Sequence, residues 1–190
     1  MKIAFQMDPI QSVDINADSS FRLAEEAQAR GHDLFFYSPD KLAYDEGRIL
    51  AQGHHFTVQR VQGDHVSLDA QEQVDLADCD VVWLRQDPPF DMHYITSTHL
   101  LDRLAGKTLV VNDPFWVRNY PEKLMVLDFP DLTPPTMIAR DLETIKSFKA
   151  RYGDIILKPL YGNGGAGVFR LDGNDRNLTS LHELFTGFSR

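Results

Sequence analysis

The sequence is poor in cysteine, in basic residues and in long apolar runs. Its 190 residues include one cysteine, Cys79, which excludes an internal disulfide framework. Lys and Arg number 19 against 28 Asp and Glu, which argues against nucleic acid or an anionic membrane as the main partner, because both require clustered basic residues. No apolar run approaches the roughly 20 residues that span a bilayer. The N-terminus, Met1 to Met7, becomes polar too soon for a signal peptide, so we expect a cytoplasmic protein.

Apolar runs and helix signals alternate over the first part of the chain. Residues 3–7 and 34–37 predict buried strands, and residues 18–31 between them predict a helix with N-capping side chains and a terminal glycine. A strand, a helix and a strand at this spacing form a βαβ unit, which predicts a parallel sheet. Residues 41–69 alternate around a turn signal and predict a β-hairpin with one wet face. Further strands are expected over residues 79–84 and 108–111, and helices over 93–105 and 121–128.

Two consecutive prolines, Pro134 and Pro135, mark the predicted domain boundary, because proline stops both a helix and a central strand. Residues 1–130 therefore predict an α/β domain with an open parallel sheet flanked by helices. Residues 131–190 predict the first, small lobe of a second domain. Its expected strands cover residues 136–139, 154–158 and 168–171, and its expected helices cover 142–151 and the surroundings of 182–185.

The segment around Lys158 carries the strongest signal for a ligand. Lys158 interrupts an apolar strand and has no acidic residue beside it. If the ammonium is buried, it needs an anionic partner; if the strand lies at an edge, the ammonium can face solvent. The strand alone does not favour either alternative. Four glycines within residues 162–167 allow positive φ angles and a concave set of N–H groups. A strand rather than a helix follows the glycines and no G-K-[ST] is present, which disfavours Rossmann and P-loop sites. The pattern is typical of a flap over nucleotide phosphates.

Polar residues also follow two predicted parallel strands, at residues 7–10 and 85–91. Ligands of open α/β sheets bind at the carboxyl ends of the strands. The planar fork of Arg85 suits a carboxylate and Asp87 suits an ammonium, a pair that fits an amino acid or a peptide. The alternative is that the prolines after Asp87 only end the strand and that Arg85 pairs with Asp87. Lys123, in a first helical turn, is by default a solvated surface lysine.

At these residues the sequence resembles prokaryotic glutathione synthetases, which are ATP-dependent ligases of the ATP-grasp class. The shared stretches, in the same order, are Met7-Asp8-Pro9-Ile10, Asp18-Ser19-Ser20-Phe21, Arg85 to Asp91, Glu122-Lys123-Leu124 and Ile155 to Gly167. The likeness spans essentially the whole chain, and the D-P-P-F-D and I-I-L-K-P-L runs are specific to that family. It implies that ATP phosphorylates γ-glutamylcysteine and that glycine attacks the acyl phosphate, which gives glutathione, ADP and phosphate.

The resemblance also implies which residues bind these ligands. Lys123 and Lys158 would contact the nucleotide phosphates, and Arg85 would help to bind γ-glutamylcysteine. The weaker candidates for the dipeptide are Asp8, Ser20 and Asp87. The flap would consist of Gly162, Asn163, Gly164, Gly165, Ala166 and Gly167. No catalytic residue is assigned within this chain.

A metal ion and an oligomer are implied by the resemblance alone. In the family, Mg²⁺ or Mn²⁺ accompanies ATP, and the residues that bind the metal lie in a further stretch that would follow Arg190. We therefore expect no metal ligands within the chain and no ligation by these 190 residues alone. Family members often form tetramers. The alternatives that stay open are another ATP-grasp carboxylate–amine ligase, a non-catalytic nucleotide- or peptide-binding fragment and, least favoured, a nicotinamide-dependent oxidoreductase.

Overall fold

The structure is a computed structural model that describes residues 1–162 and 164–187. The chain divides into two compact units, Met1–Tyr120 and Pro121–Arg190. The division lies before the boundary near residue 130 that the two prolines predict. The reason is that the short helical turns just before Pro134 pack on one another within the second unit. No described helix is both long and apolar enough to cross a membrane.

The described residues of the first unit form a mixed sheet of seven strands. The strand order is β3-β4-β2-β1-β6-β7, and β5 pairs with β4. Strands β2, β1, β6 and β7 run parallel to one another, whereas β3, β4 and β5 form antiparallel pairs. The predicted α/β fold and the predicted hairpin are both confirmed. The strands are β1 (Lys2–Gln6), β2 (Asp33–Tyr37), β3 (Leu42–Asp45), β4 (Arg48–Val58), β5 (Val66–Asp75), β6 (Val81–Leu84) and β7 (Leu109–Val111).

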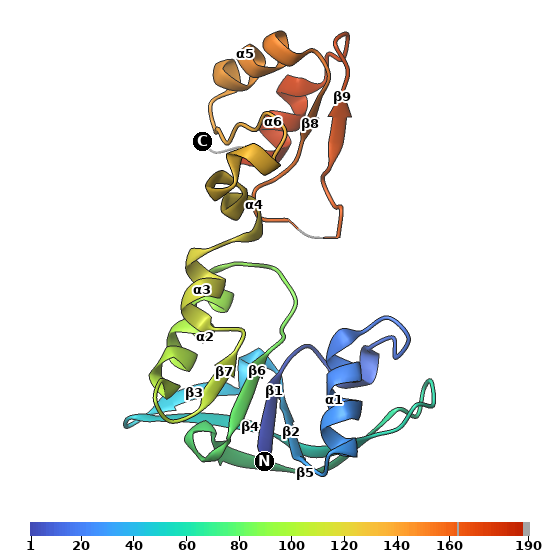
Figure 1. Ribbon diagram of the computed structural model, residues 1–190, viewed down its shortest axis with the longest axis vertical. Helices are drawn as coiled ribbons and strands as arrows, with labels where there is room; N and C mark the ends of the chain where they lie inside the picture. The colour runs from blue at the N-terminus through green and yellow to red at the C-terminus, as the bar shows by residue number, and fades with distance from the viewer. Residues whose placement is uncertain (163, 188–190) are drawn as a thin grey trace. The chain divides into compact units, whose positions relative to one another are not determined.

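Helices cover both faces of this sheet (Figure 1). On one face, Phe21 of helix α1 packs with Ile3 and Phe5 of β1. On the other face, Leu101 of helix α2 packs with Ala4. This split follows from the alternation of side chains along β1. The helices are α1 (Ser19–Ala29), α2 (Met92–Leu101) and α3 (Pro114–Asn119), with 3-10 turns η1 (Ile10–Ser12), η2 (Pro39–Lys41), η3 (Leu76–Asp78) and η4 (Asp102–Leu104).

The ends of α1 follow from local chemistry. The Asp18 carboxylate accepts a hydrogen bond of 2.7 Å from the Phe21 N–H, which satisfies one of the free donors of the first turn. Gly31, at φ +73°, follows the last turn in the left-handed conformation that favours glycine. Phe5 and Phe21 are fully buried, and each such ring contributes about 1.5–3 kcal/mol of transfer free energy. Cys79 is buried in the core on the α2 face.

The order of the strands creates a crevice between β1 and β6. The chain leaves β1 through α1 toward β2 on one side, and it leaves β6 through α2 toward β7 on the other side. The carboxyl ends of β1 and β6 therefore meet where the direction of winding changes. Such a point is the usual ligand site of an open α/β sheet.

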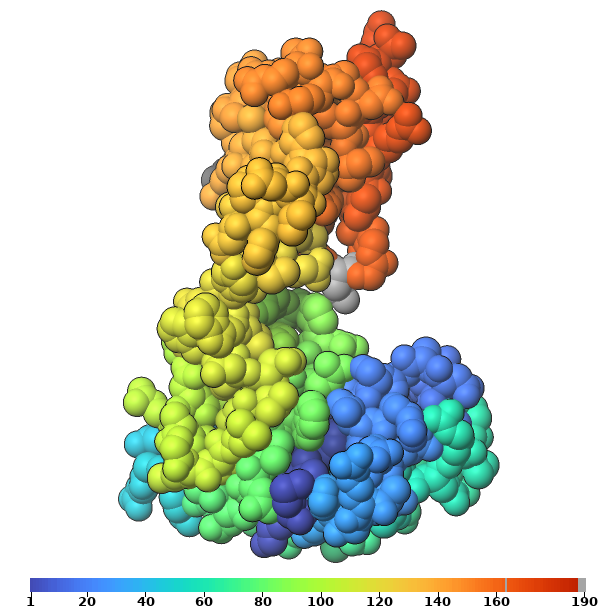
Figure 2. Space-filling view, in the orientation of Figure 1, coloured from blue at the N-terminus to red at the C-terminus, as the bar shows by residue number. Residues whose placement is uncertain are grey.

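The β4–β5 hairpin extends past the central strands and turns onto α1. A register shift between His54 and Phe56 marks a bulge, which bends the ribbon. Beyond it, Phe56 and Val58 are buried with α1 in one core cluster. The blue-green surface of the hairpin end lies against the blue surface near α1 (Figure 2).

The second unit packs two helices on one face of an antiparallel strand pair. Ile155, Leu171 and Leu178 form its buried centre. The strand, glycine loop and strand predicted from the sequence are confirmed, but the strand predicted over residues 136–139 is wrong. That segment follows two prolines and pairs with no described strand. The elements are α4 (Glu122–Met125), η5 (Val126–Asp128), η6 (Pro130–Leu132), α5 (Leu142–Tyr152), β8 (Ile155–Leu157), β9 (Phe169–Leu171) and α6 (Leu178–Thr186).

Candidate functional site

A small polar cavity of about 140 Å³ opens at the carboxyl ends of β1 and β6. Its lining comes from these two ends and from the segment that leads into α1. The lining residues are Met7, Asp8, Ser12, Val13, Asp18, Ser20, Arg85 and Asp87. Four residues selected from the sequence, Asp8, Ser20, Arg85 and Asp87, thus lie around one cavity.

Arg85 is held in this cavity by the first turn of α1. Its Nε donates a hydrogen bond of 3.0 Å to Ser20 Oγ, and its Nη2 donates one of 2.5 Å to Ser19 Oγ. Ser20 is buried, at 3% exposed. The two bonds use one edge of the guanidinium and leave the Nη1 edge for another partner. Among the ion pairs of the described residues there is none between Arg85 and Asp87, the pair required by the alternative interpretation.

Asp8 connects the two strand ends. Its Oδ2 accepts a hydrogen bond of 2.6 Å from the backbone N–H of Asp87. Tyr94, which the sequence did not indicate, lies near the same charges: burial raises the pKa of its phenol, Arg85 opposes the rise, and Asp87 and Asp8 add to it. The cavity therefore combines one fixed cation with carboxylates at the exits of adjacent strands.

A second polar group, also not indicated by the sequence, lies behind the exit of β6. Gln6 is fully buried and donates through Nε2 to Gln86 Oε1, which also accepts a hydrogen bond of 3.2 Å from Ser97 Oγ. Gln86 follows Arg85 directly, and successive side chains of an extended segment point to opposite sides. These bonds therefore fix the exit of β6 from the α2 side, while Ser19 and Ser20 hold Arg85 from the α1 side.

The glycine loop of the second unit has the backbone that its sequence predicts. Gly164, Gly165 and Gly167 have φ angles of +58°, +76° and +72°. A Cβ on Gly167 would lie 3.1 Å from Pro159 Cδ and 3.3 Å from a ring carbon of Phe185, so this glycine also permits close packing. Gly164, Gly165 and Ala166 are exposed. Asn163, another predicted flap residue, lies outside the described residues.

The two candidate lysines differ in their surroundings. Lys123 is half-buried and its Nζ donates a hydrogen bond to the Gly162 carbonyl, so it contacts the loop and is not the solvated lysine expected by default. Lys158 is exposed, and the interpretation of a buried ammonium is wrong. Side chains alternate along β8, and Lys158 continues the exposed side of Ile156, away from the face that α5 and α6 cover.

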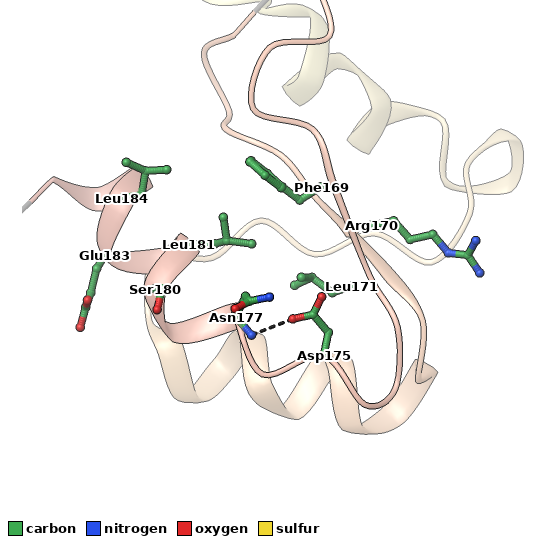
Figure 3. Close-up of a pocket in the computed structure, with 9 residues that line it drawn as sticks. All are labelled: Phe169, Arg170, Leu171, Asp175, Asn177, Ser180, Leu181, Glu183 and Leu184. Carbon is green, nitrogen blue, oxygen red and sulfur yellow. Dashed lines mark hydrogen bonds between the residues drawn. The ribbon is translucent and has the colours of Figure 1, made fainter.

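A larger cavity of about 520 Å³ lies between β9 and α6 (Figure 3). Its inner wall is apolar and includes Phe169, Leu171, Leu181 and Leu184. The guanidinium of Arg170 points away from it in Figure 3 and pairs with Asp154 at 2.8 Å. This cavity contains none of the residues selected from the sequence.

The described part of the chain contains no group of three or more His, Cys, Asp or Glu side chains placed to hold a metal ion. The acidic residues around the small cavity are engaged in other contacts: Asp8 with a backbone N–H and Asp18 with the start of α1. We assign no metal to this cavity.

Comparison with known families accounts for both units. Residues 1–118 match the family described as "Prokaryotic glutathione synthetase, N-terminal domain", and residues 122–190 match "Prokaryotic glutathione synthetase, ATP-grasp domain". The chain belongs to the prokaryotic glutathione synthetase family. The junction between the two family matches coincides with the division of the chain after Tyr120.

Relatives within the glutathione synthetase family cover nearly the whole chain. The chain is 56% identical over 185 residues to the glutathione synthetase of Brucella melitensis and 55% identical over 185 residues to that of Mesorhizobium japonicum. Each alignment covers 97% of this chain and 59% of the relative. The glutathione synthetase of Vibrio parahaemolyticus is 38% identical over 98% of the chain. The chain thus spans about three fifths of the length of these family members.

Solved structures of other ATP-grasp ligases share the fold. The ATP-grasp ligase PsnB complexed with minimal precursor has a TM-score of 0.53 at 17% identity, over 95% of this chain and 60% of that chain. The D-alanyl-alanine synthetase A of Vibrio cholerae has a TM-score of 0.53 at 12% identity, over 99% of this chain and 56% of that chain. At these identities the likeness confirms the ATP-grasp fold of the family.

Proposed function

We propose that this chain supplies the dipeptide site and part of the nucleotide site of a glutathione synthetase. In the proposed reaction, the cysteinyl carboxylate of γ-glutamylcysteine attacks the γ-phosphorus of ATP, which forms an acyl phosphate and releases ADP. The amine of glycine then attacks the acyl carbon, phosphate leaves, and an amide bond is formed. The relatives named glutathione synthetase support this proposal. The early polar residues of the N-terminus are the reason that we expect the protein to act in the cytoplasm.

The observation that carries the proposal is the fixed guanidinium of Arg85 in the cavity at the strand ends. Ser19 and Ser20 hold one edge of the guanidinium, so the other edge can bind a carboxylate of the dipeptide without further ordering. Asp87 is the proposed partner of the dipeptide ammonium. Asp8 supports Asp87 through its backbone N–H, and Ser20 contributes chiefly through Arg85.

The proposed nucleotide site is the glycine loop with its two lysines. Lys123 contacts the loop at Gly162, and Lys158 follows the strand that leads into it. The N–H groups of residues 162–167 are the proposed partners of the phosphate oxygens, with the two ammonium groups balancing the charge. This part of the protein would contribute position and electrostatic stabilisation, as in other phosphoryl transfers.

Mg²⁺ or Mn²⁺ is the ion that we propose to accompany ATP in a protein of the relatives' full length. One structural neighbour is described as complexed with Mg and ADP. The described residues provide no metal cluster, so no step above depends on a metal ligand from this chain. We expect ligation only from a protein of the relatives' full length, and a tetramer is the proposed assembly.

Calorimetric titration tests the dipeptide site directly. The chain should bind γ-glutamylcysteine, and Arg85→Lys should weaken binding by at least about tenfold, because lysine keeps the charge and loses the fork. Arg48→Lys is the matched control, since Arg48 is exposed and pairs only with Asp45 among the described ion pairs. Equal affinities of the wild type and Arg85→Lys would contradict the proposed site. Tighter binding of a different acid would favour another ATP-grasp ligase.

A further inference from the structure

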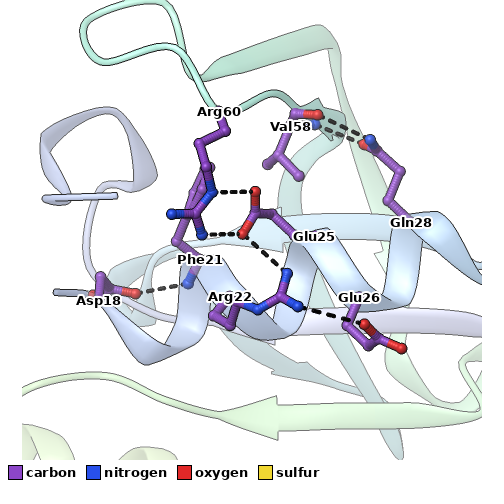
Figure 4. A network of polar contacts seen from close by, with 8 residues as sticks. All are labelled: Asp18, Phe21, Arg22, Glu25, Glu26, Gln28, Val58 and Arg60. Atoms are coloured by element: carbon purple, nitrogen blue, oxygen red, sulfur yellow. Dashed lines mark hydrogen bonds and ion pairs between the residues drawn. The ribbon is translucent and has the colours of Figure 1, made fainter. Parts of the chain in front are cut away.

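Three side chains connect the end of the β4–β5 hairpin to the segments around the small cavity. We call residues 58–65 the hairpin tip. Gln28 of α1 donates to the Val58 carbonyl at 2.9 Å and accepts from the Val58 N–H at 2.7 Å. Arg60 donates from Nε and Nη2 to the two carboxylate oxygens of Glu25, at 3.0 and 2.6 Å (Figure 4). The tip thus holds α1 at two successive turns.

The third connection holds η1. His65 is 3% exposed, and its Nε2 lies 2.8 Å from the Ile10 carbonyl. A carbonyl only accepts, so Nε2 carries the proton and donates. The imidazole also packs edge-on against Phe21 at 5.7 Å between ring centroids. His65 therefore connects the tip to η1 and to the first turns of α1 together.

The segments held in this way form one wall of the cavity. The first turn of α1 carries Ser19 and Ser20, which bind the Arg85 guanidinium. Ser12, the last residue of η1, and Val13 also line the cavity. Each contact of the tip therefore acts on an element that has one end at the cavity. On α1, Glu25 and Gln28 lie five to nine residues after Ser19 and Ser20.

Apart from Val58 and the ring of His65, the tip adds little apolar burial. Arg60 is 49% exposed at its side chain and Val61 is 52% exposed. Apolar packing of α1 tolerates small rotations and shifts of the helix, whereas paired hydrogen bonds have preferred distances and directions. The paired hydrogen bonds of Gln28 and the bidentate ion pair of Arg60 therefore restrict the position of the helix more specifically than the core alone. Arg60 also holds the pKa of the Glu25 carboxyl below its usual range.

We propose that the hairpin tip is a positioning element for the Arg85 cavity. Arg60, Gln28 and His65 hold α1 and η1 so that the hydroxyls of Ser19 and Ser20 meet one edge of the guanidinium. The other edge is thereby presented to the ligand. Only the identity of that ligand, γ-glutamylcysteine, rests on the proposed function.

Two variants and a matched control test the proposal. Arg60→Ala removes the ion pair between the tip and Glu25 of α1, and Gln28→Ala removes the two hydrogen bonds with the backbone of Val58. Arg22→Ala is the control, because Arg22 also contacts Glu25, at 3.3 Å, but does so from within α1. The first measurement is the hydrogen exchange of the Arg85 Nε–H by NMR, which needs no ligand. The second is the dissociation constant for γ-glutamylcysteine.

The expected changes are ordered by the solvent exposure of the contacts removed, because each variant loses two hydrogen bonds. Arg60→Ala should speed exchange at Arg85 and weaken dipeptide binding, each by about threefold, in line with an exposed ion pair. Gln28→Ala should have a larger effect, about tenfold, because its two hydrogen bonds with Val58 are part-buried and less screened by water than the exposed ion pair. Arg60→Lys should show a smaller change than Arg60→Ala in both the Arg85 exchange rate and dipeptide binding, because lysine keeps the charge. Arg22→Ala should equal the wild type in both measurements.

Several outcomes would overturn the proposal. One is an Arg85 exchange rate in Arg60→Ala equal to that in Arg22→Ala. Another is a loss of thermal stability in Arg60→Ala with unchanged Arg85 exchange, which would make the tip a stabilising element only. If Gln28→Ala does not fold, the exposed Arg60 still decides. A wild-type chain that does not bind the dipeptide overturns the proposed function, while the exchange rates continue to decide the role of the tip.

Discussion

The two units of the chain hold their candidate ligand-binding groups in different ways. In the first unit, Arg85 is fixed by two hydroxyls of a helix that packs on a large sheet. In the second unit, Lys158 is exposed and Lys123 contacts a backbone carbonyl of a glycine loop. A prearranged fork suits the selection of one carboxylate. An exposed ammonium group, a second one beside the loop and the N–H groups of a glycine-rich backbone suit phosphates, which present many equivalent oxygens.

The first unit also has the larger and more deeply buried core. Both faces of the first sheet carry a cluster of fully buried side chains, such as Phe5 and Leu101. The buried centre of the second unit consists of Ile155, Leu171 and Leu178 among its described residues. Side-chain positions are determined most closely where packing is dense. We therefore expect a substitution in one unit to change stability or ligand binding in that unit and not in the other.

The largest expected effect separates the units by stability. Phe21→Ala should destabilise the first unit by about 3–5 kcal/mol, because it removes a fully buried ring. Urea denaturation followed by amide hydrogen exchange should show the loss in residues 1–120 and unchanged protection in α5. Phe115→Ala, at a ring 49% exposed, is the control and should have little effect. Equal loss of protection in both units would show that they unfold as one.

The next effect separates the units by ligand. Lys123→Ala should weaken ATP binding by about tenfold to a hundredfold, the range for a hydrogen bond to a charged group. Binding of γ-glutamylcysteine should be unchanged. Lys149→Ala is the matched control, since Lys149 also donates to a glycine carbonyl, Gly173 O at 3.1 Å, but lies outside the loop. A loss of ATP affinity as large in Lys149→Ala would contradict the proposed role of Lys123.

A smaller effect tests the backbone of the glycine loop. Gly167→Ala should cost about 1–2 kcal/mol, because alanine is strained at positive φ and its Cβ would press on Pro159. Gly173→Ala, where a Cβ has no neighbour within 4 Å, should change stability by less than about 0.5 kcal/mol. Thermal unfolding of the two variants measures the difference. If both substitutions are neutral, the loop does not need the left-handed conformation at this position.

The smallest effect compares one ion pair in each unit. Hydrogen bonds from Arg60 lower the pKa of Glu25, and a hydrogen bond from Arg170 lowers the pKa of Asp154. A carboxyl with a lowered folded-state pKa adds stability above its unfolded value of about 4, and this stability is lost as the pH falls through the lowered value. Arg60→Gln and Arg170→Gln should each flatten the acid limb of the stability curve. An unchanged limb would show that these surface pairs are fully screened.

Local chemistry made much of the fold predictable. Asp18 as a helix cap, Gly31 after the helix and the hairpin around residues 41–69 each follow from residue types within a few positions. The predicted division near residue 130 misses the observed one because proline marks a break in regular structure. The units, in contrast, are defined by contacts between segments distant along the chain.

The candidate site was predictable only in part, for a related reason. Arg85 and Asp8 could be selected because strand exits of an open sheet share one edge. The partnership of Arg85 with Ser19 spans 66 positions of sequence, and that of Gln6 with Gln86 spans 80. Such pairs depend on the packing of α1 and on the strand register, which spacing does not contain. The exposure of Lys158 likewise depends on which face of β8 the helices cover.

The buried Cys79 has a consequence for a protein proposed to handle thiols. Burial raises the pKa of its thiol to about 11, so roughly one molecule in ten thousand carries the thiolate at pH 7. Exchange with a disulfide requires the thiolate and access to it. The chain should therefore resist mixed-disulfide formation with oxidised glutathione or oxidised γ-glutamylcysteine, and its folded state would not couple to the redox balance of the thiol pool that it is proposed to supply.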